Sequence, residues 1–133
     1  MTDQPEDDPL KALKEYVANL PQAEQDKTLD DPHELFEMIE RGDAVGVFIA
    51  VKNGADVEIT NENGMTPLHH AAANEMPLIT EALNQELNQA LWMKDKFGRT
   101  PLSLIEATHS QDFRFIVDRR VRDRLILQLH KER

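Results

Sequence analysis

The order of hydrophobic and polar residues along the chain predicts short helices joined by tight turns. In the segment 31–59, "DPHELFEMIERGDAVGVFIAVKNGADVEI", a helix-like run ends near Gly42, and a second, more apolar run follows it. Gly54 then ends this second helix as a left-handed cap, since glycine has no Cβ to oppose a positive φ. We expect the buried face of the second helix to consist of Val47, Phe48, Ile49 and Val51.

Both ends of the chain also show helical spacing. In "DPLKALKEYVANL", Asp8 is expected to cap a helix that has Pro9 in its first turn. Its apolar residues are Leu10, Leu13, Val17 and Leu20. This helix should cover the first repeated unit, and a polar connection should follow over residues 21–30. At the other end, residues 112–133 predict a capping helix whose apolar face carries Phe113, Ile116, Val117, Val121, Leu125 and Leu129.

The middle of the chain contains an internal repeat. The stretch "NENGMTPLHHAAANE" from Asn61 aligns with "DKFGRTPLSLIEATH" from Asp95, at an offset of 34 residues (95 minus 61). A third, degenerate copy lies upstream in the segment 31–59. A period of this length predicts stacked two-helix units.

Each copy has its own local chemistry. Asn63-Gly64 forms a tight-turn pair, in which glycine supplies the positive φ. Thr66 can cap a helix through its hydroxyl, and Pro67 suits the first helical position, where no N–H is needed. A small apolar stripe, which lets neighbouring helices pack closely, is formed by Leu68, Ala71 and Ala72.

The stretches "GMTPLHHAA", "NGADVEITNENG" and "DKFGRTPLSL" resemble the G-x-TPLH-x-AA and GADVN elements of the ankyrin repeat. The resemblance covers residues 31–117, about two thirds of the chain. It implies an all-α solenoid of helix-turn-helix units with short β-hairpin-like loops. The single domain would then comprise an N-terminal capping helix and linker (1–30), a degenerate repeat (31–60), two further repeats (61–94 and 95–118) and a C-terminal capping helix (119–133).

Several positions depart from the family pattern. The first copy has "PHEL" in place of Thr-Pro-Leu, and Glu75 stands where a glycine usually separates the helices. The stretch "LNQALWM", residues 87–93, replaces GADVN, which leaves the conformation of this loop open; we expect Trp92 to pack beneath it. The third copy has Ser103 in place of the histidine and Ile105-Glu106 in place of the alanine pair.

The adjacent histidines His69 and His70 raise the question of a metal site. The resemblance implies instead that Thr66 and His69 hydrogen-bond within and between repeats, and that His70 faces the helix packing or its edge. The other histidines are His33, His109 and His130, which lie in other units without carboxylate or cysteine spacing around them. The chain has no cysteine, which excludes disulfides and metal-thiolate sites. We therefore expect neither a metal nor a cofactor.

Catalytic motifs are absent from the sequence: it has no Walker loop, no G-x-S-x-G, no HExxH and no G-x-G-x-x-G. We expect a non-catalytic module for protein–protein interaction rather than an enzyme. The sequence leaves open whether it acts as an inhibitor of the immunity type, as an adaptor or as a secreted effector that engages host proteins.

The charge is strongly uneven. The formal net charge is −10. Residues 1–66 hold 16 acidic and 5 basic residues, giving −11, so the remainder carries +1. This balance disfavours nucleic acid and anionic lipid, and it favours a protein partner with a basic patch. The acidic N-terminus and the lack of an apolar run of about 20 residues predict a cytoplasmic protein, which we expect to be a monomer.

By the family's layout, the partner would meet loop tips and exposed positions of the inner helices. The candidates are Glu40, Arg41, Glu62, Asn63, Met65, Asn74, Lys96, Phe97, Arg99 and Thr108. Met65 and Phe97 are the apolar candidates for anchors, because a large side chain at a loop tip offers surface that a partner can desolvate.

Overall fold

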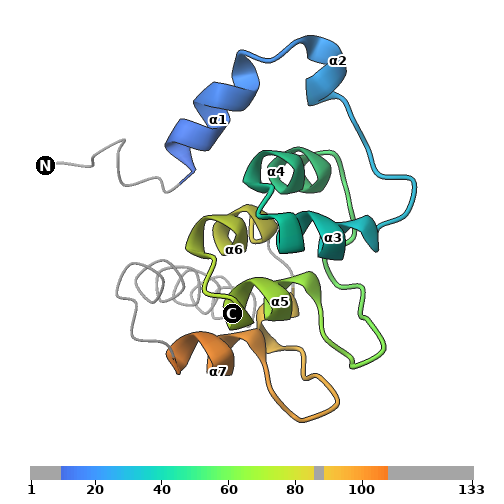
Figure 1. The fold of residues 1–133 in the computed structure, drawn as a ribbon, viewed down its shortest axis with the longest axis vertical. Coiled ribbons are helices and arrows are strands. Elements are labelled where there is room, and N and C mark those ends of the chain that lie inside the picture. Colours follow the sequence, from blue (N-terminus) through green and yellow to red (C-terminus); the bar gives the residue numbers. More distant parts are fainter. Residues whose placement is uncertain (1–9, 86–88, 108–133) are drawn as a thin grey trace, which may run out of the picture.

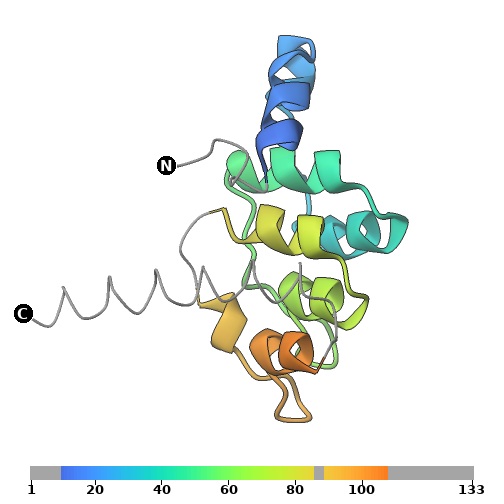
Figure 2. The ribbon, with the colours of Figure 1, turned by 90° about the vertical axis from the view of Figure 1, so that its left-hand side faces the viewer.

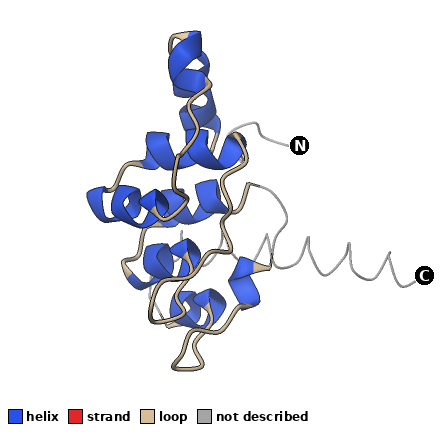
Figure 3. Cartoon of the chain, turned by 90° about the vertical axis from the view of Figure 1, so that its right-hand side faces the viewer, coloured by secondary structure: helices blue, strands red, loops and turns tan. Residues whose placement is uncertain are grey.

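The fold is a stack of short helices joined by loops (Figure 1). The computed structural model describes residues 10–85 and 89–107. Within these ranges the helices are α1 (Lys11–Ala18), α2 (Gln22–Gln25), α3 (Glu34–Arg41), α4 (Ala44–Lys52), α5 (Pro67–Ala73), α6 (Pro77–Leu83), the 3₁₀ helix η2 (Ala90–Trp92) and α7 (Pro101–Glu106). The described part has no strand (Figure 3), so the expected all-α solenoid is confirmed.

The helices form two rows. In the first row, α5 packs between α3 and α7, and in the second row α4 packs on α6. Each of the first two repeats contributes one helix to each row, since α3 pairs with α4 and α5 pairs with α6 (Figures 1 and 2). Helix α1 lies on α4 at one end of the stack. No described helix has both the length and the apolar character that a bilayer crossing requires.

The two helices of the first repeat end close to the glycines that the sequence predicts. Gly42, with φ +73°, ends α3, and the Asp43 side chain caps α4 by accepting the Gly46 N–H at 2.9 Å. Gly54 has φ +102° and follows Asn53, the C-cap residue of α4. The Ala55 N–H donates to the Ala50 carbonyl at 3.0 Å in the same turn. The predicted left-handed cap at Gly54 is therefore confirmed.

One hydrophobic core runs through the stack. The four apolar residues predicted for α4 are all buried, as is the small-residue stripe of α5. Leu10, Leu13 and Val17 extend the core from the first helix. Burial of this kind contributes roughly 25 cal/mol per Å² of apolar surface removed from water, so continuous packing between units stabilises the whole stack.

The N-terminal region differs from its prediction in two places. Helix α1 begins at Lys11, with Leu10 at the N-cap position and no side-chain cap; the expected cap Asp8 lies outside the described residues. The expected polar connection over 21–30 contains the short helix α2. The Gln25 side chain closes this turn by donating to the Leu20 carbonyl at 2.8 Å.

The loop after α6 also differs from expectation. Ala90 and Leu91 are buried there, whereas Trp92 is 38 % exposed, so the prediction that Trp92 packs beneath the loop is wrong. Successive residues of a 3₁₀ helix point about 120° apart, and one of three must face away from the core. Residues 86–88 and the predicted C-terminal capping helix (119–133) lie outside the described residues.

Glu75 adopts a backbone conformation that normally belongs to glycine. Its φ is +54°, and no other described non-glycine residue has a positive φ. The reversal it makes between α5 and α6 repeats the one at Gly42: the N–H of each donates to the carbonyl three residues earlier, at 3.1 Å for Glu75 and 2.9 Å for Gly42. A side chain in this region costs about 1–2 kcal/mol.

We predict that Glu75→Gly raises the free energy of unfolding by about 0.5–1 kcal/mol, because relief of the backbone strain exceeds the entropy that glycine adds to the unfolded chain. Urea denaturation monitored by circular dichroism measures the change. The control is Glu75→Ala, which removes the carboxylate but keeps a Cβ and should give no such gain. An equal gain from both variants would show that the charge, and not the backbone, is unfavourable.

Candidate protein-binding surface

Two hairpin loops project from the row of α3, α5 and α7 (Figure 1). The first hairpin (residues 61–65) precedes α5. The Asn61 N–H donates to the Met65 carbonyl at 3.0 Å, and Gly64 supplies the turn with φ +74°. The Asn61 side-chain oxygen accepts the Met65 N–H at 3.0 Å as well. The loop is thus closed by its own first residue.

The second hairpin (residues 95–99) precedes α7 and is built in the same way. The Asp95 N–H donates to the Arg99 carbonyl at 2.8 Å, and Gly98 has φ +80°. The Asp95 carboxylate accepts the N–H groups of Phe97 and Arg99, each at 2.9 Å. The 34-residue offset in the sequence is therefore a structural repeat.

The two hairpins are also joined to each other. The Lys96 N–H donates to the Asn63 carbonyl at 2.9 Å. A Cβ on Gly64 would lie only 3.1 Å from the Lys96 nitrogen. Glycine is required at this position for the close approach as well as for the positive φ.

His69 fixes the start of α5. Its backbone N–H donates to the Thr66 hydroxyl at 3.2 Å, and its Nδ1 accepts the Thr66 N–H at 3.0 Å. Each residue thus satisfies an N–H that the helix itself leaves without a partner.

The other nitrogen of the same ring reaches the next repeat. His69 Nε2 lies 2.8 Å from the Arg99 carbonyl. A carbonyl can only accept, so Nε2 carries the proton and Nδ1 is the acceptor. The expectation that Thr66 and His69 bond within and between repeats is confirmed. The ring is fully buried, and burial lowers the pKa of His69 below its usual value, which keeps it neutral.

Ser103 occupies the position of His69 in the third repeat. It forms the same kind of helix cap as His69 does. Its N–H and hydroxyl complete a reciprocal cap with Thr100, with both bonds at 3.0 Å. The Ser103 hydroxyl donates back to the Thr100 carbonyl at 2.8 Å. Among the hydrogen bonds of the described residues, none joins the Ser103 side chain to another repeat.

His70 lies at the packing edge, as expected. It is half-buried and meets the Phe36 ring edge-on, with 5.1 Å between the ring centroids. The described residues contain no group of three or more histidine, cysteine or acidic side chains that could hold a metal ion.

The tip of the second hairpin exposes an aromatic ring between two cations. Phe97 is 66 % exposed. The Arg99 guanidinium lies 5.2 Å from its ring centroid, and the Lys96 ammonium lies 5.8 Å from it. Contacts of this kind contribute about 0.5–1 kcal/mol at exposed sites and limit the motion of the ring.

Arg99 is itself held in place by Asp95. Its Nε and one terminal nitrogen each lie 2.8 Å from Asp95 Oδ2. Burial of the Asp95 carboxylate opposes ionisation, but the hydrogen bonds from Arg99 and Phe97 outweigh it and lower its pKa. Sequence reasoning missed Asp95; the signal was an Asn or Asp three residues before the glycine in both copies, which is typical of an Asx turn.

The structure brings together six of the predicted contact residues. Glu62, Asn63 and Met65 lie in the first hairpin, and Lys96, Phe97 and Arg99 lie in the second. Asn63 and Met65 are half-buried, and the other four are exposed.

The remaining candidates lie elsewhere. Glu40 and Arg41 are exposed at the C-terminal end of α3, and Asn74 is exposed at the C-terminal end of α5. In α5 this is the end opposite the first hairpin, about 10 Å away for a helix of this length. Thr108 lies outside the described residues. The two hairpins therefore form the more compact candidate surface.

Comparison with known proteins agrees with this geometry. A family model described as ankyrin repeats, in three copies, matches residues 35–121. A search of curated proteins finds no match.

We predict that His69→Ala lowers the free energy of unfolding by about 1–2 kcal/mol, because it removes the cap and the bond to Arg99. Ser103→Ala is the matched control: it removes only the equivalent cap and should cost less. Thermal and urea denaturation of both variants give the difference. Equal losses would mean that the bond between repeats adds nothing to stability.

The pKa of His69 predicts a pH dependence. The folded state holds the ring neutral, whereas in the unfolded chain it binds a proton near pH 6.5. The stability from His69 is therefore complete above about pH 6.5 and is lost as the pH falls toward the lower folded pKa, by at most about 1.4 kcal/mol per pH unit. The difference in unfolding free energy between wild type and His69→Gln should shrink between about pH 7.5 and pH 5. A constant difference would contradict the neutral buried ring.

Proposed function

The chain belongs to the ankyrin-repeat family, and on that basis we propose that it binds another protein through the first and second hairpins. Ankyrin repeats generally mediate protein–protein interaction and are typically not catalytic. Stacked repeats hold their loops in a fixed relation to one another, which limits the entropy that is lost on binding.

The exposed ring of Phe97 is the observation that carries this proposal. An aromatic side chain that is two thirds exposed at a loop tip is costly to leave in water and favourable to bury in a partner. Arg99 and Lys96 lie beside the ring, and Arg99 is already fixed by Asp95. The partner therefore meets a preorganised anchor and not a mobile one.

The charges on the two hairpins favour a partner surface that carries charges of both signs. The second hairpin carries the cations Lys96 and Arg99, whereas the first hairpin carries the anion Glu62. Charges of both signs on one surface favour orientation and partner choice over raw affinity. We propose a partner whose basic patch faces the acidic first repeat.

An inhibitor, an adaptor and an effector would all use this surface. They differ in the effect of binding: an inhibitor blocks the partner's activity, and an adaptor brings two proteins together. Affinity capture from the native cell with wild-type protein and with Phe97→Ala, followed by mass spectrometry, identifies proteins that depend on the hairpin tip.

We predict that Phe97→Ala weakens binding of the captured partner by at least about tenfold and leaves the fold intact, because truncating a buried aromatic anchor commonly costs about 2 kcal/mol or more. Glu62→Gln should mainly slow association at low salt. Surface plasmon resonance measures both rates. The control is Tyr16→Ala, which removes an exposed aromatic ring of α1 and should bind as wild type. Wild-type dissociation of Phe97→Ala would place the interface elsewhere.

A further inference from the structure

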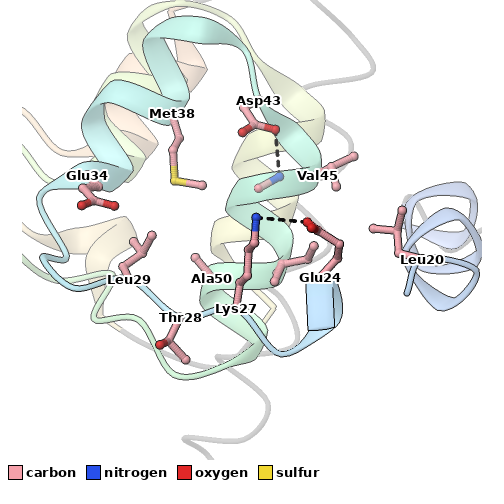
Figure 4. A pocket seen from close by; sticks show the side chains of 12 residues that line it. Leu20, Glu24, Lys27, Thr28, Leu29, Glu34, Met38, Asp43, Val45 and Ala50 are labelled. Atoms are coloured by element: carbon pink, nitrogen blue, oxygen red, sulfur yellow. Dashed lines mark hydrogen bonds and ion pairs between the residues drawn. The ribbon is translucent and has the colours of Figure 1, made fainter. Parts of the chain in front are cut away.

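A cleft lies at the opposite end of the stack from the second hairpin, between the segment that links α2 to α3 and the α3–α4 pair (Figure 4). Its volume is about 390 Å³, within the range of about 300–1,000 Å³ that is usual for ligand pockets. Neither the repeat pattern nor the hairpin surface accounts for it.

The floor of the cleft is apolar. Ile49 and Ala50 come from the buried face of α4, and the other apolar lining residues are half-buried: Leu20, Leu29, Met38 and Val45. Figure 4 shows the Met38 thioether pointing into the middle of this group. Methionine is flexible and polarisable, so it adapts its packing to an inserted side chain.

Gly46 sets the depth of the cleft at this point. A Cβ at this position would overlap both the Met38 methyl group and the Asp43 carboxylate. The Met38 side chain can therefore lie directly on the backbone of α4. The cleft thus depends on a residue without a side chain.

The linker on the other side is held in position. The Asn53 side chain, which follows α4, donates to the carbonyls of Gln25 at 2.9 Å and Lys27 at 2.7 Å. These bonds fix the linker to one end of α4. The cleft is therefore bounded by bonded segments on both sides.

Acidic side chains surround this apolar floor. Glu24, Glu34 and Asp43 line the cleft with a single cation, Lys27, which gives −2 (three carboxylates less one ammonium). Lys27 pairs with Glu24 at 3.1 Å, and Asp43 lies 3.7 Å from Arg41. Glu34 forms no ion pair among the described residues. In Figure 4, Glu34 and Glu24 lie on either side of the apolar group.

We propose that this cleft binds a lysine or arginine side chain of the partner protein. The aliphatic stem of such a residue would cover the apolar floor, and its charged head would meet the carboxylates at the rim. The carboxylates would repel an acidic side chain. A purely apolar side chain would form no ion pair with them. The proposal rests on the proposed function and gives the basic patch of the partner a defined place to dock.

The methionine methyl groups allow a test without the partner. In protein labelled with ¹³C at the methionine methyls, we titrate N-acetyl-argininamide and, as the uncharged counterpart, N-acetyl-norleucinamide. We expect the Met38 signal to shift in a saturable way with the arginine compound, with about three- to fivefold tighter binding than for norleucine, as an exposed ion pair provides. Met65, Met76 and Met93 do not line the cleft and should not shift.

Charge variants sharpen the result. Glu34→Gln should weaken binding of the arginine compound about threefold, and Lys27→Gln should strengthen it by a similar factor, since each changes one charge at the rim. The control, Lys11→Gln, removes an exposed cation outside the cleft and should have no effect. Equal affinity for both compounds, unchanged affinity in the rim variants, or shifts spread over all methionines would overturn the proposal.

The test is independent of the hairpin surface. If argininamide fails to bind while Phe97→Ala still abolishes partner capture, the cleft proposal is wrong and the proposed function stands. If argininamide binds as expected while Phe97→Ala has no effect, the hairpin assignment is wrong and the cleft remains a site for basic side chains.

Discussion

The hydrogen-bonded imidazole of His69 is the constraint on which the arrangement of the repeats depends. One ring nitrogen accepts the Thr66 N–H at the start of α5, and the other donates to the Arg99 carbonyl in the second hairpin. The bond from the Thr66 N–H requires a neutral ring, because Nδ1 must be free to accept, and burial keeps the ring neutral. A single side chain therefore sets the start of one helix and the distance to the next repeat.

The candidate contact surface follows from that constraint. His69 bonds to the backbone carbonyl of Arg99, and Asp95 pairs with the Arg99 side chain. The Arg99 guanidinium in turn lies beside the Phe97 ring. Phe97, the residue expected to meet a partner, is thus linked to the buried His69 through its contact with Arg99. Such preorganisation reduces the entropy lost on binding, which is the physical reason that a small stack of helices can present a defined surface.

The N-terminal end of the stack is built from α1, α2 and the linker that follows α2. At this end α1 packs on α4. The linker after α2 is held by Asn53, and an apolar cleft with an acidic rim lies between it and the α3–α4 pair. The strongly acidic front half of the sequence therefore includes carboxylates gathered around one cavity, in addition to those that keep the surface solvated.

Reading the sequence was enough to predict the features that depend on neighbouring residues: the repeat offset, the helix reversal at Gly42, the Thr-Pro helix starts and the buried face of α4. These features follow from local hydrogen bonding and side-chain periodicity. The folded structure was needed to find that Trp92 is partly exposed and that Asn53 holds the linker after α2. The same holds for the Lys96–Asn63 bond between hairpins and for the cleft over Gly46. Each of these depends on which distant segments pack together, and the spacing of residues along one chain does not specify such contacts.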